Sequence, residues 1–272
     1  MSRLQRYQRN DTFAAAALSF TDLLYVSIVR EFRSENGGAI MSFFWGLARP
    51  MMIFIVFWLL YEVIGRGALI RGDFIMFMLS GIFLYLLHIR AVKNLKGVGH
   101  SAAGMIFYAR ASTLLNILAS ALHELYVSII SIAVILTMAY LLRGYLEVYD
   151  PTAVLLPFFI AWASGFGVGL VFLAVTPLLP RLAPLLFNAY RRIQMFTSGK
   201  MFLANYLPSN LIVYFSWNPL FHCIDQARGA IFINYLPRYT NMEYPVYFTL
   251  VAITIGLIVE YALRAARDRG LE

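Results

Sequence analysis

Two adjacent arginines, Arg191 and Arg192, stand in a stretch that is otherwise largely apolar. The planar guanidinium group pairs with phosphate and carboxylate groups through parallel hydrogen bonds, so this pair could meet an acidic or phosphorylated molecule. A helix that starts at Pro184 would place both arginines about two turns from its beginning. They would then face an aqueous path, or lie at the cytoplasmic headgroups, where membrane proteins concentrate Lys and Arg. The residues alone leave both interpretations open.

A second charged position, Glu124, follows His123 inside a long apolar segment. Ionisable groups within a membrane are costly and often functional, so Glu124 could serve a proton or ion relay. The segment has about 30 residues, which would make a helix of about 45 Å, longer than the hydrocarbon core. We therefore favour the simpler interpretation that Glu124 lies near the inner surface or pairs with a neighbouring helix.

Other chemistry-bearing patterns are missing from the sequence. Lys200 follows Gly199, but the chain has no Gly-x4-Gly-Lys-Ser/Thr motif, so it is not expected to bind ATP in that way. Its four histidines lack metal-ligand spacing, and the single Cys223 excludes an internal disulfide and a cysteine metal cluster. We expect no metal, no cofactor and no catalytic residue in this chain, and so no enzyme.

Composition indicates where these residues lie. The 272 residues are 61% hydrophobic and only 13% charged, with a mean hydropathy of +0.71, whereas soluble domains carry about 25% charged residues. The chain is therefore an all-α, multi-pass membrane protein, and no cleavable signal is visible after the basic N-terminus. The net charge of +8 fits cytoplasmic loops beside anionic lipid and needs no nucleic acid.

Six apolar segments are predicted to span the membrane, since a span takes about 20 residues. They cover residues 39–64, 73–92, 113–142, 152–180, 183–203 and 244–263. Arg191, Arg192 and Lys200 interrupt the fifth, while Gly165 and Gly169 in the fourth have the spacing of close helix packing. With both termini cytoplasmic, most of the 22 Lys and Arg residues lie inside.

An amphipathic helix is predicted before the first span, at residues 21–36. Ser19 to Asp22 read as a capping box, and Leu24, Ile28 and Phe32 share one face. A helix this short lies in the membrane interface. The expected organisation is a cytoplasmic N-terminus with this helix at 1–38, a six-span domain at 39–264 and a cytoplasmic tail at 265–272.

Residues 196–232 are apolar but repeatedly broken, at Gly199, Pro208, Asn218 and Pro219. Because lipid does not tolerate unpaired backbone, such a segment is expected only where protein buries it or where it lines a path. We predict a re-entrant segment between the fifth and sixth spans, with a hydrophobic extramembrane loop as the alternative. In the loop 93–112, a short amphipathic patch ending at Tyr108 could dock a soluble subunit or lie at the headgroups.

Two blocks of the sequence carry a resemblance to a known family. Val29-Arg30-Glu31 and Arg33 precede a Trp-x4-Pro pattern formed by Trp45 and Pro50. Ser198-Gly199 and Leu207-Pro208 then precede the block Asn218-Pro219-Leu220-x-His222-x5-Arg228. Together they resemble the permease subunits of type-2 ABC exporters, and among these the capsule and O-antigen polysaccharide exporters. Ser34 to Gly37 and Lys200 depart from the family pattern, and the surroundings of Arg110 match it only loosely.

The resemblance implies a homodimer that moves lipid-linked polysaccharide across a bacterial inner membrane. Two separate ATPase subunits would bind ATP and Mg, and periplasmic and outer-membrane export proteins are further possible partners. Residues implied in coupling to the ATPase are Arg30, Glu31, Arg33, Phe107, Tyr108 and Arg110. Residues implied in the translocation path or its gate are Trp45, Arg49, Pro50, Trp58, Tyr61, Arg191, Arg192, Asn218, Pro219, His222 and Arg228. The alternatives are a type-2 permease for a drug or lipid and an ion-coupled carrier that uses Glu124.

Overall fold

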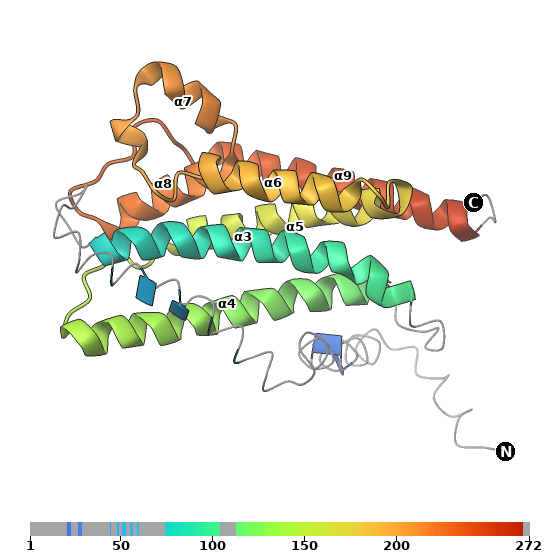
Figure 1. Ribbon diagram of the computed structural model, residues 1–272, viewed down its shortest axis with the longest axis horizontal. Helices are drawn as coiled ribbons and strands as arrows, with labels where there is room; N and C mark the ends of the chain where they lie inside the picture. The colour runs from blue at the N-terminus through green and yellow to red at the C-terminus, as the bar shows by residue number, and fades with distance from the viewer. Residues whose placement is uncertain are drawn as a thin grey trace, which may run out of the picture.

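The computed structural model describes residues 74–103 and 113–268, together with a few isolated positions between 21 and 59 (Figure 1). Within these residues the chain is helical and contains no strand. The order is α3 Phe74–Ala103, α4 Thr113–Arg143, α5 Leu155–Leu178, α6 Ala183–Thr197, the 3-10 turn η2 Ala204–Tyr206, α7 Ser209–Ser216, α8 Pro219–Ile231 and α9 Glu243–Asp268. The predicted all-α class is therefore confirmed for the described part of the chain.

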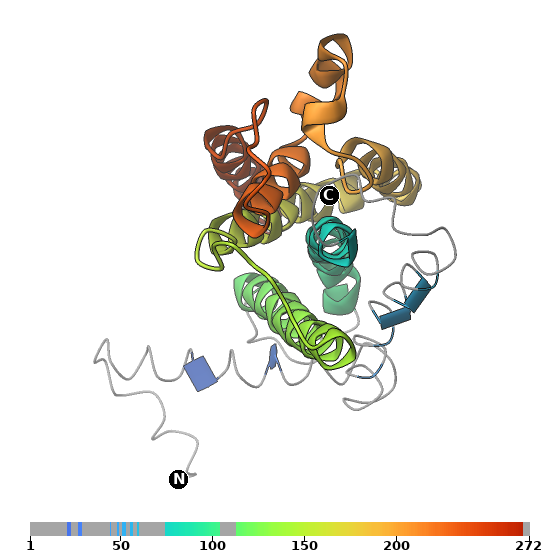
Figure 2. The same ribbon diagram turned by 90° about the vertical axis from the view of Figure 1, so that its left-hand side faces the viewer.

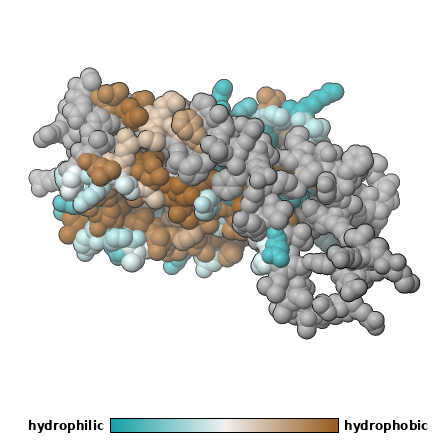
Figure 3. All heavy atoms as spheres, turned by 90° about the horizontal axis from the view of Figure 1, so that it is seen from below, coloured by the Kyte–Doolittle hydropathy of each residue, from teal (hydrophilic) through white to brown (hydrophobic). Residues whose placement is uncertain are grey.

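Four of these helices are long and apolar enough to cross a membrane. Their candidate spans are Phe74–Val98, Leu114–Leu141, Leu155–Leu178 and Glu243–Leu263. They coincide with four of the predicted segments, those at 73–92, 113–142, 152–180 and 244–263. Lipid or other protein must cover much of their surface, because the windows in α4 and α9 are only 28% and 22% buried. Figure 3 shows hydrophobic side chains over much of the described surface on the α4 side.

The fifth predicted segment, 183–203, does not form one long helix. Its helix α6 ends at Thr197 and is not among the candidate spans. Its 15 residues make about 22 Å of helix, less than the thickness of about 30 Å of the hydrocarbon core. The chain leaves the helix at Gly199, whose φ of +73° is a conformation that glycine adopts without strain. The described residues therefore contain four clear spans, and the six-span topology stays a prediction.

Several predictions fall outside the described residues. They concern most of the interface helix 21–36, most of the first span 39–64 and the loop between residues 103 and 113. The described positions inside the first two segments are helical, among them Thr21, Ser27 and Met51. The domain boundaries at 38 and 264 stay predictions.

Helix α3 is the centre of the bundle, since it packs against α4, α5, α6 and α8 (Figure 2). Helix α5 lies between α3 and α9. Its glycines allow this close approach, because any larger residue would collide with the neighbouring helices. A Cβ added at Gly165 would lie only 2.6 Å from the His88 carbonyl oxygen of α3, and one added at Gly167 would lie only 3.0 Å from the Ala252 Cβ of α9. The predicted role of Gly165 and Gly169 in close helix packing is thus confirmed.

We expect Gly165→Ala to destabilise the protein by about 1–3 kcal/mol, because the added methyl group meets backbone that cannot move away without separating α3 from α5. The measurement is the thermal unfolding midpoint of the purified protein in detergent. Gly97→Ala is the matched control, since nothing lies within 4 Å of a Cβ at Gly97 in α3. Equal midpoints for Gly165→Ala and wild type would contradict the close contact.

The connection from α4 to α5 is hydrogen-bonded to the last turn of α8. The backbone N–H groups of Tyr149 and Asp150 donate to the carbonyls of Ile231 and Ala230, at 3.0 and 2.9 Å. The Asp150 carboxylate accepts hydrogen bonds from the Thr152 hydroxyl and the Ala153 backbone, which lower its pKa. This exposed turn thus ties the start of α5 to the end of α8.

Candidate functional site

Helix α6 carries two exposed arginines. Its inward face is formed by Ala183, Phe187 and Gln194, which are buried at helical spacing. Both arginines are exposed, but Arg191 lies at the edge of that face, since the Tyr85 hydroxyl of α3 donates to its backbone carbonyl at 3.5 Å. Exposed apolar side chains share this outer surface, namely Leu185, Leu186, Ile193, Met195 and Phe196. A surface that combines two cations with large apolar groups suits contact with another molecule better than contact with bulk water.

A chain of buried polar side chains joins α6 to three other helices. The Asn218 amide donates to Gln194 Oε1 at 2.6 Å, and the Gln194 amide donates to the Tyr190 hydroxyl at 2.8 Å. Tyr190 lies 2.6 Å from His88 Nε2, while His88 Nδ1 lies 3.1 Å from the carbonyl oxygen of Ala161 in α5. Since a carbonyl can only accept, this pattern assigns the His88 proton to Nδ1 and makes Tyr190 the donor to Nε2.

The hydrogen bonds of this network all donate in the same direction, from Asn218 to Gln194, from Gln194 to Tyr190 and from Tyr190 to His88. Such a network is stabilising because every buried polar group in it has a partner. It sets the rotation of α6 about its axis, since Tyr190 and Gln194 must face α3 and the start of α8. The exposure of Arg191 and Arg192 follows from that rotation.

Asn218 also begins α8. Its side-chain oxygen accepts from the backbone N–H of Leu220 at 3.0 Å, and Pro219 occupies the first turn. Both features are typical of helix starts, because a cap satisfies an orphan N–H and proline lacks one. Eleven of the thirteen residues of α8 are buried, so this short helix lies inside the protein, against α3, α5 and α9.

We expect Asn218→Ala to lower stability by about 2–4 kcal/mol, since it removes a helix cap worth about 1 kcal/mol and leaves the buried Gln194 oxygen without a donor. The thermal unfolding midpoint in detergent measures this loss. Asn210→Ala, on the exposed surface of α7, is the control and should unfold as wild type does. A midpoint for Asn218→Ala within the error of the control would count against the network.

Arg228 holds the broken backbone after α6. Its side chain is 1% exposed, and Nη1 donates to the carbonyls of Gly199 and Phe202 at 2.8 and 2.6 Å, while Nη2 donates to that of Lys200 at 2.7 Å. The guanidinium also lies over the Phe77 ring of α3, 3.9 Å from its centroid. These carbonyls belong to a turn that has no helical partners, so Arg228 supplies the hydrogen bonds that the non-helical backbone lacks.

The loop between α8 and α9 is also fixed by hydrogen bonds to side chains of α8. His222 Nδ1 accepts from the Asn241 backbone at 3.1 Å, so its Nε2 carries the proton that it donates to the Ser216 carbonyl at 2.8 Å. The Asp225 carboxylate accepts from the hydroxyls of Tyr235 and Thr240. Both side chains of α8 therefore fasten the chain that leads into α9.

The structure thus brings together four of the residues predicted for a path or gate, Asn218, Pro219, His222 and Arg228, as buried parts of one helix. Arg191 and Arg192 lie apart from them on the outer face of α6. The remaining predicted site residues lie outside the described part of the chain; they are Arg30, Glu31, Arg33, Trp45, Arg49, Pro50, Trp58, Tyr61, Phe107, Tyr108 and Arg110. Their proposed roles in coupling and in the path stay predictions.

Sequence reasoning missed the side chains that join α6 to the bundle. His88, Tyr190 and Gln194 form most of the chain of hydrogen bonds, yet only His88 had a usable signal, as a lone histidine within an apolar segment. Glu124 is 3% exposed and accepts hydrogen bonds from Asn94 at 2.8 Å and Ser128 at 3.1 Å. This agrees with the interpretation of Glu124 as a group paired with a neighbouring helix.

The arrangement defines a multi-pass α-helical membrane protein in which buried polar groups hold short, interrupted helices against long spans. Among the described residues, no cluster of three His, Cys, Asp or Glu side chains could hold a metal ion. The buried polar groups described above hold the bundle together, and Arg191 and Arg192 are exposed cations that α6 can offer to another molecule.

Comparison with known proteins refines this class. No family model matches the chain. The chain is similar to two Escherichia coli proteins, each named polysialic acid transport protein KpsM, with 23% and 22% identity over 229 residues. The aligned region covers 84% of this chain and 88% of each relative. This match confirms the resemblance to capsule polysaccharide export permeases and leaves the drug-export and ion-carrier alternatives unsupported.

Proposed function

We propose that this chain is the membrane-spanning permease subunit of an ATP-driven exporter of lipid-linked capsular polysaccharide. The observation that carries the proposal is the similarity to polysialic acid transport proteins over 84% of the chain. The multi-pass helical architecture supports it, because such a subunit must surround a path through the membrane. The chain would transport rather than catalyse, and ATP hydrolysis with Mg would belong to a separate partner.

The proposed topology has six spans with both termini in the cytoplasm. Helices α3, α4, α5 and α9 supply four, residues 39–64 supply the first, and the α6 region supplies the fifth. One end of the bundle holds the end of α3, the start of α6 and the end of α9, with Lys93, Lys96, Arg181, Arg264 and Arg267. This excess of cations supports a cytoplasmic position for that end.

Helices α7 and α8 would form the re-entrant segment that closes the outer mouth of the path. Helix α8 has 13 residues, or about 20 Å, which is too short to cross the hydrocarbon core. Its burial and its link to the α4–α5 turn through Ala230 and Ile231 support an entry from the outer side and a return to it. Figure 1 shows α7 projecting from the bundle at this end.

The outer face of α6 would line the path and meet a second copy of the chain. Arg191 and Arg192 would attract an acidic polymer, since guanidinium groups bind carboxylates strongly. Polysialic acid, the cargo in the name of the relatives, is itself an acidic polysaccharide. The exposed apolar groups beside the arginines, such as Ile193 and Phe196, would give the homodimer its contact.

The ATPase partner would act on the cytoplasmic side, through the helix at 21–36 and the loop around Tyr108. A push on these segments would be passed to the first span and α6, and the path would open. The capsule class also implies periplasmic and outer-membrane export proteins as further partners in a bacterial inner membrane.

The proposal is tested by gentle purification of the tagged chain from its native membrane. We expect an ATPase subunit in equal amount, a particle that contains two copies of each subunit, and a glycolipid that mass spectrometry identifies as carrying a polymer of sugars. A chain that copurifies with no ATPase in several detergents would overturn the ATP-driven mechanism. A retained drug-like or simple lipid cargo would overturn the polysaccharide assignment.

A further inference from the structure

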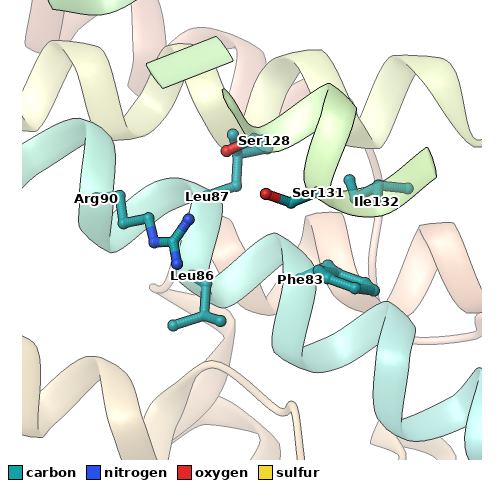
Figure 4. Close-up of a pocket in the computed structure, with 7 residues that line it drawn as sticks. All are labelled: Phe83, Leu86, Leu87, Arg90, Ser128, Ser131 and Ile132. Atoms are coloured by element: carbon teal, nitrogen blue, oxygen red, sulfur yellow. The ribbon is translucent and has the colours of Figure 1, made fainter. Parts of the chain in front are cut away.

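Arg90 of α3 is a cation whose hydrogen bonding is incomplete. Its Nη2 atom is buried and has no hydrogen-bond partner in the described part of the chain. Figure 4 shows the guanidinium beside a small cavity between α3 and α4, together with Ser128 and Ser131. Ser131 donates its proton to the Val127 carbonyl at 2.7 Å, and Ser128 donates to Glu124 at 3.1 Å. A buried guanidinium edge without an acceptor is costly, so this place favours an anionic group.

The depth of Arg90 identifies the kind of anion. The candidate span of α3, Phe74–Val98, has 25 residues, or about 37 Å of helix, which exceeds the hydrocarbon core of about 30 Å by about five residues. With this excess at the end that carries the exposed Lys93, the boundary between hydrocarbon and headgroups falls near Lys93, and Arg90 lies less than one turn inside it. The phosphates of a membrane leaflet lie just beyond this boundary, and a long arginine side chain can reach them.

A much larger cavity continues from this place toward the other end of α3. It has a volume of about 410 Å³ and shares the residues Phe83 and Ile132 with the small cavity beside Arg90. Apart from Ser80, its lining is apolar, with side chains of α3 and α4 on its long sides and the start of α5 and the end of α8 beyond. Helices α4 and α5 both pack against α3, and they meet each other beyond the cavity, where the Trp162 indole donates to the Ala121 carbonyl at 3.2 Å. The space between them is therefore bounded by α3 and lies on the apolar side of the bundle.

We propose that a membrane phospholipid occupies this space, with its phosphate at Arg90 and one acyl chain in the apolar cavity. On α3 the cavity extends from Leu84 to Met76, about 9 to 21 Å from Arg90 at 1.5 Å per residue. An acyl chain that extends through one leaflet, about 15 Å, reaches the middle of it. The charge, the depth and the lining thus match the headgroup and the chain of a single lipid.

An acyl chain is a better occupant than water. Water needs several polar partners in a cavity, and this lining offers one hydroxyl group that already donates to the Phe77 carbonyl at 2.9 Å. An empty space of this size would deprive its lining of dispersion contacts. The proposal requires only a chain that spans the membrane, so it does not depend on the export function.

The test uses the full-length protein in vesicles of phosphatidylcholine that contain a phosphatidylglycerol probe with a photoreactive diazirine on its acyl chain. We expect the probe to label peptides that line the cavity, residues 76–84 of α3 and 129–136 of α4. Arg90→Gln should reduce this labelling about tenfold, because it removes the charge-assisted hydrogen bond to the phosphate. Lys93→Gln is the matched control, since it removes an exposed cation one turn along the same helix and should leave the labelling unchanged.

Two further arms make the result decisive. Ala133→Phe keeps Arg90 but fills the cavity from α4, and it should also abolish the labelling. A diacylglycerol probe with the same diazirine chain lacks the phosphate and should label the wild-type cavity weakly. Because the vesicles contain no polysaccharide, labelling there reports a phospholipid and not the anchor of an export substrate.

Equal labelling by both probes, or unchanged labelling of Arg90→Gln, would overturn the proposal. A cross-linking result would also overturn the proposal. Ile129 lines the cavity, and if Ile129→Cys formed a disulfide between two copies in the membrane, a second protein and not a lipid would cover the site.

Discussion

Arg228→Met is expected to leave little folded protein in the membrane. Methionine retains much of the apolar stem but removes the donors to the carbonyls of Gly199, Lys200 and Phe202. The Lys200 and Phe202 carbonyls lose their donors at a cost of about 1–3 kcal/mol each, while the Gly199 carbonyl still accepts from the Phe202 N–H at 3.3 Å. The total loss is therefore at least about 2 kcal/mol, a large fraction of the stability of a typical domain. The measurement is the yield and the unfolding midpoint of the variant fused to a fluorescent reporter, by size-exclusion chromatography in detergent.

Arg238→Met provides the control for this change. Arg238 is exposed in the loop after α8, so its loss should alter neither yield nor unfolding midpoint. Arg228→Lys should give an intermediate result, because an ammonium group cannot satisfy three carbonyls with the geometry of the planar guanidinium. Normal yield and stability of Arg228→Met would show that water or another group satisfies this turn.

The double change Arg191→Gln with Arg192→Gln is expected to reduce polysaccharide export more than tenfold while the protein still assembles. Both side chains are exposed, so folding does not depend on them. If each guanidinium makes a hydrogen bond to an acidic polymer, worth about 1.5–3 kcal/mol, their joint loss exceeds the 1.4 kcal/mol that corresponds to a factor of ten. The readout is polymer at the cell surface, measured beside the amount of ATPase that copurifies with the permease.

Two companion variants separate a role in the path from a role at the headgroups. Arg181→Gln removes an exposed arginine before α6 and should export normally. Arg191→Lys with Arg192→Lys keeps both charges. If the arginines contact headgroups, this variant should export as wild type does, whereas if their planar guanidinium groups bind the polymer, export should recover only in part. Unchanged export by the double glutamine variant would remove the proposed contact with the polymer.

The four long spans could be predicted from residue order alone. Runs of about 20 apolar residues satisfy their own backbone as helices in lipid, and α3, α4, α5 and α9 lie where such runs occur. The close approach of α5 was also visible, because Gly165 and Gly169 repeat on one face. Local breaks were equally readable, since Gly199 and Pro219 act through their own backbone geometry.

Only the tertiary structure decided what the polar residues do. The role of Arg228 in a path or gate stays a prediction, but its hydrogen-bond partners came from the structure alone. They lie 26 to 29 residues earlier in the chain, in a turn that no periodic pattern reveals. His88 and Tyr190 are 102 residues apart, and their contact determines which way Arg191 and Arg192 point. Apolar periodicity reports which side of a helix faces the core, because burial acts on every residue of that side. A buried hydrogen bond instead depends on the position of one distant partner, which exists only once the helices have packed.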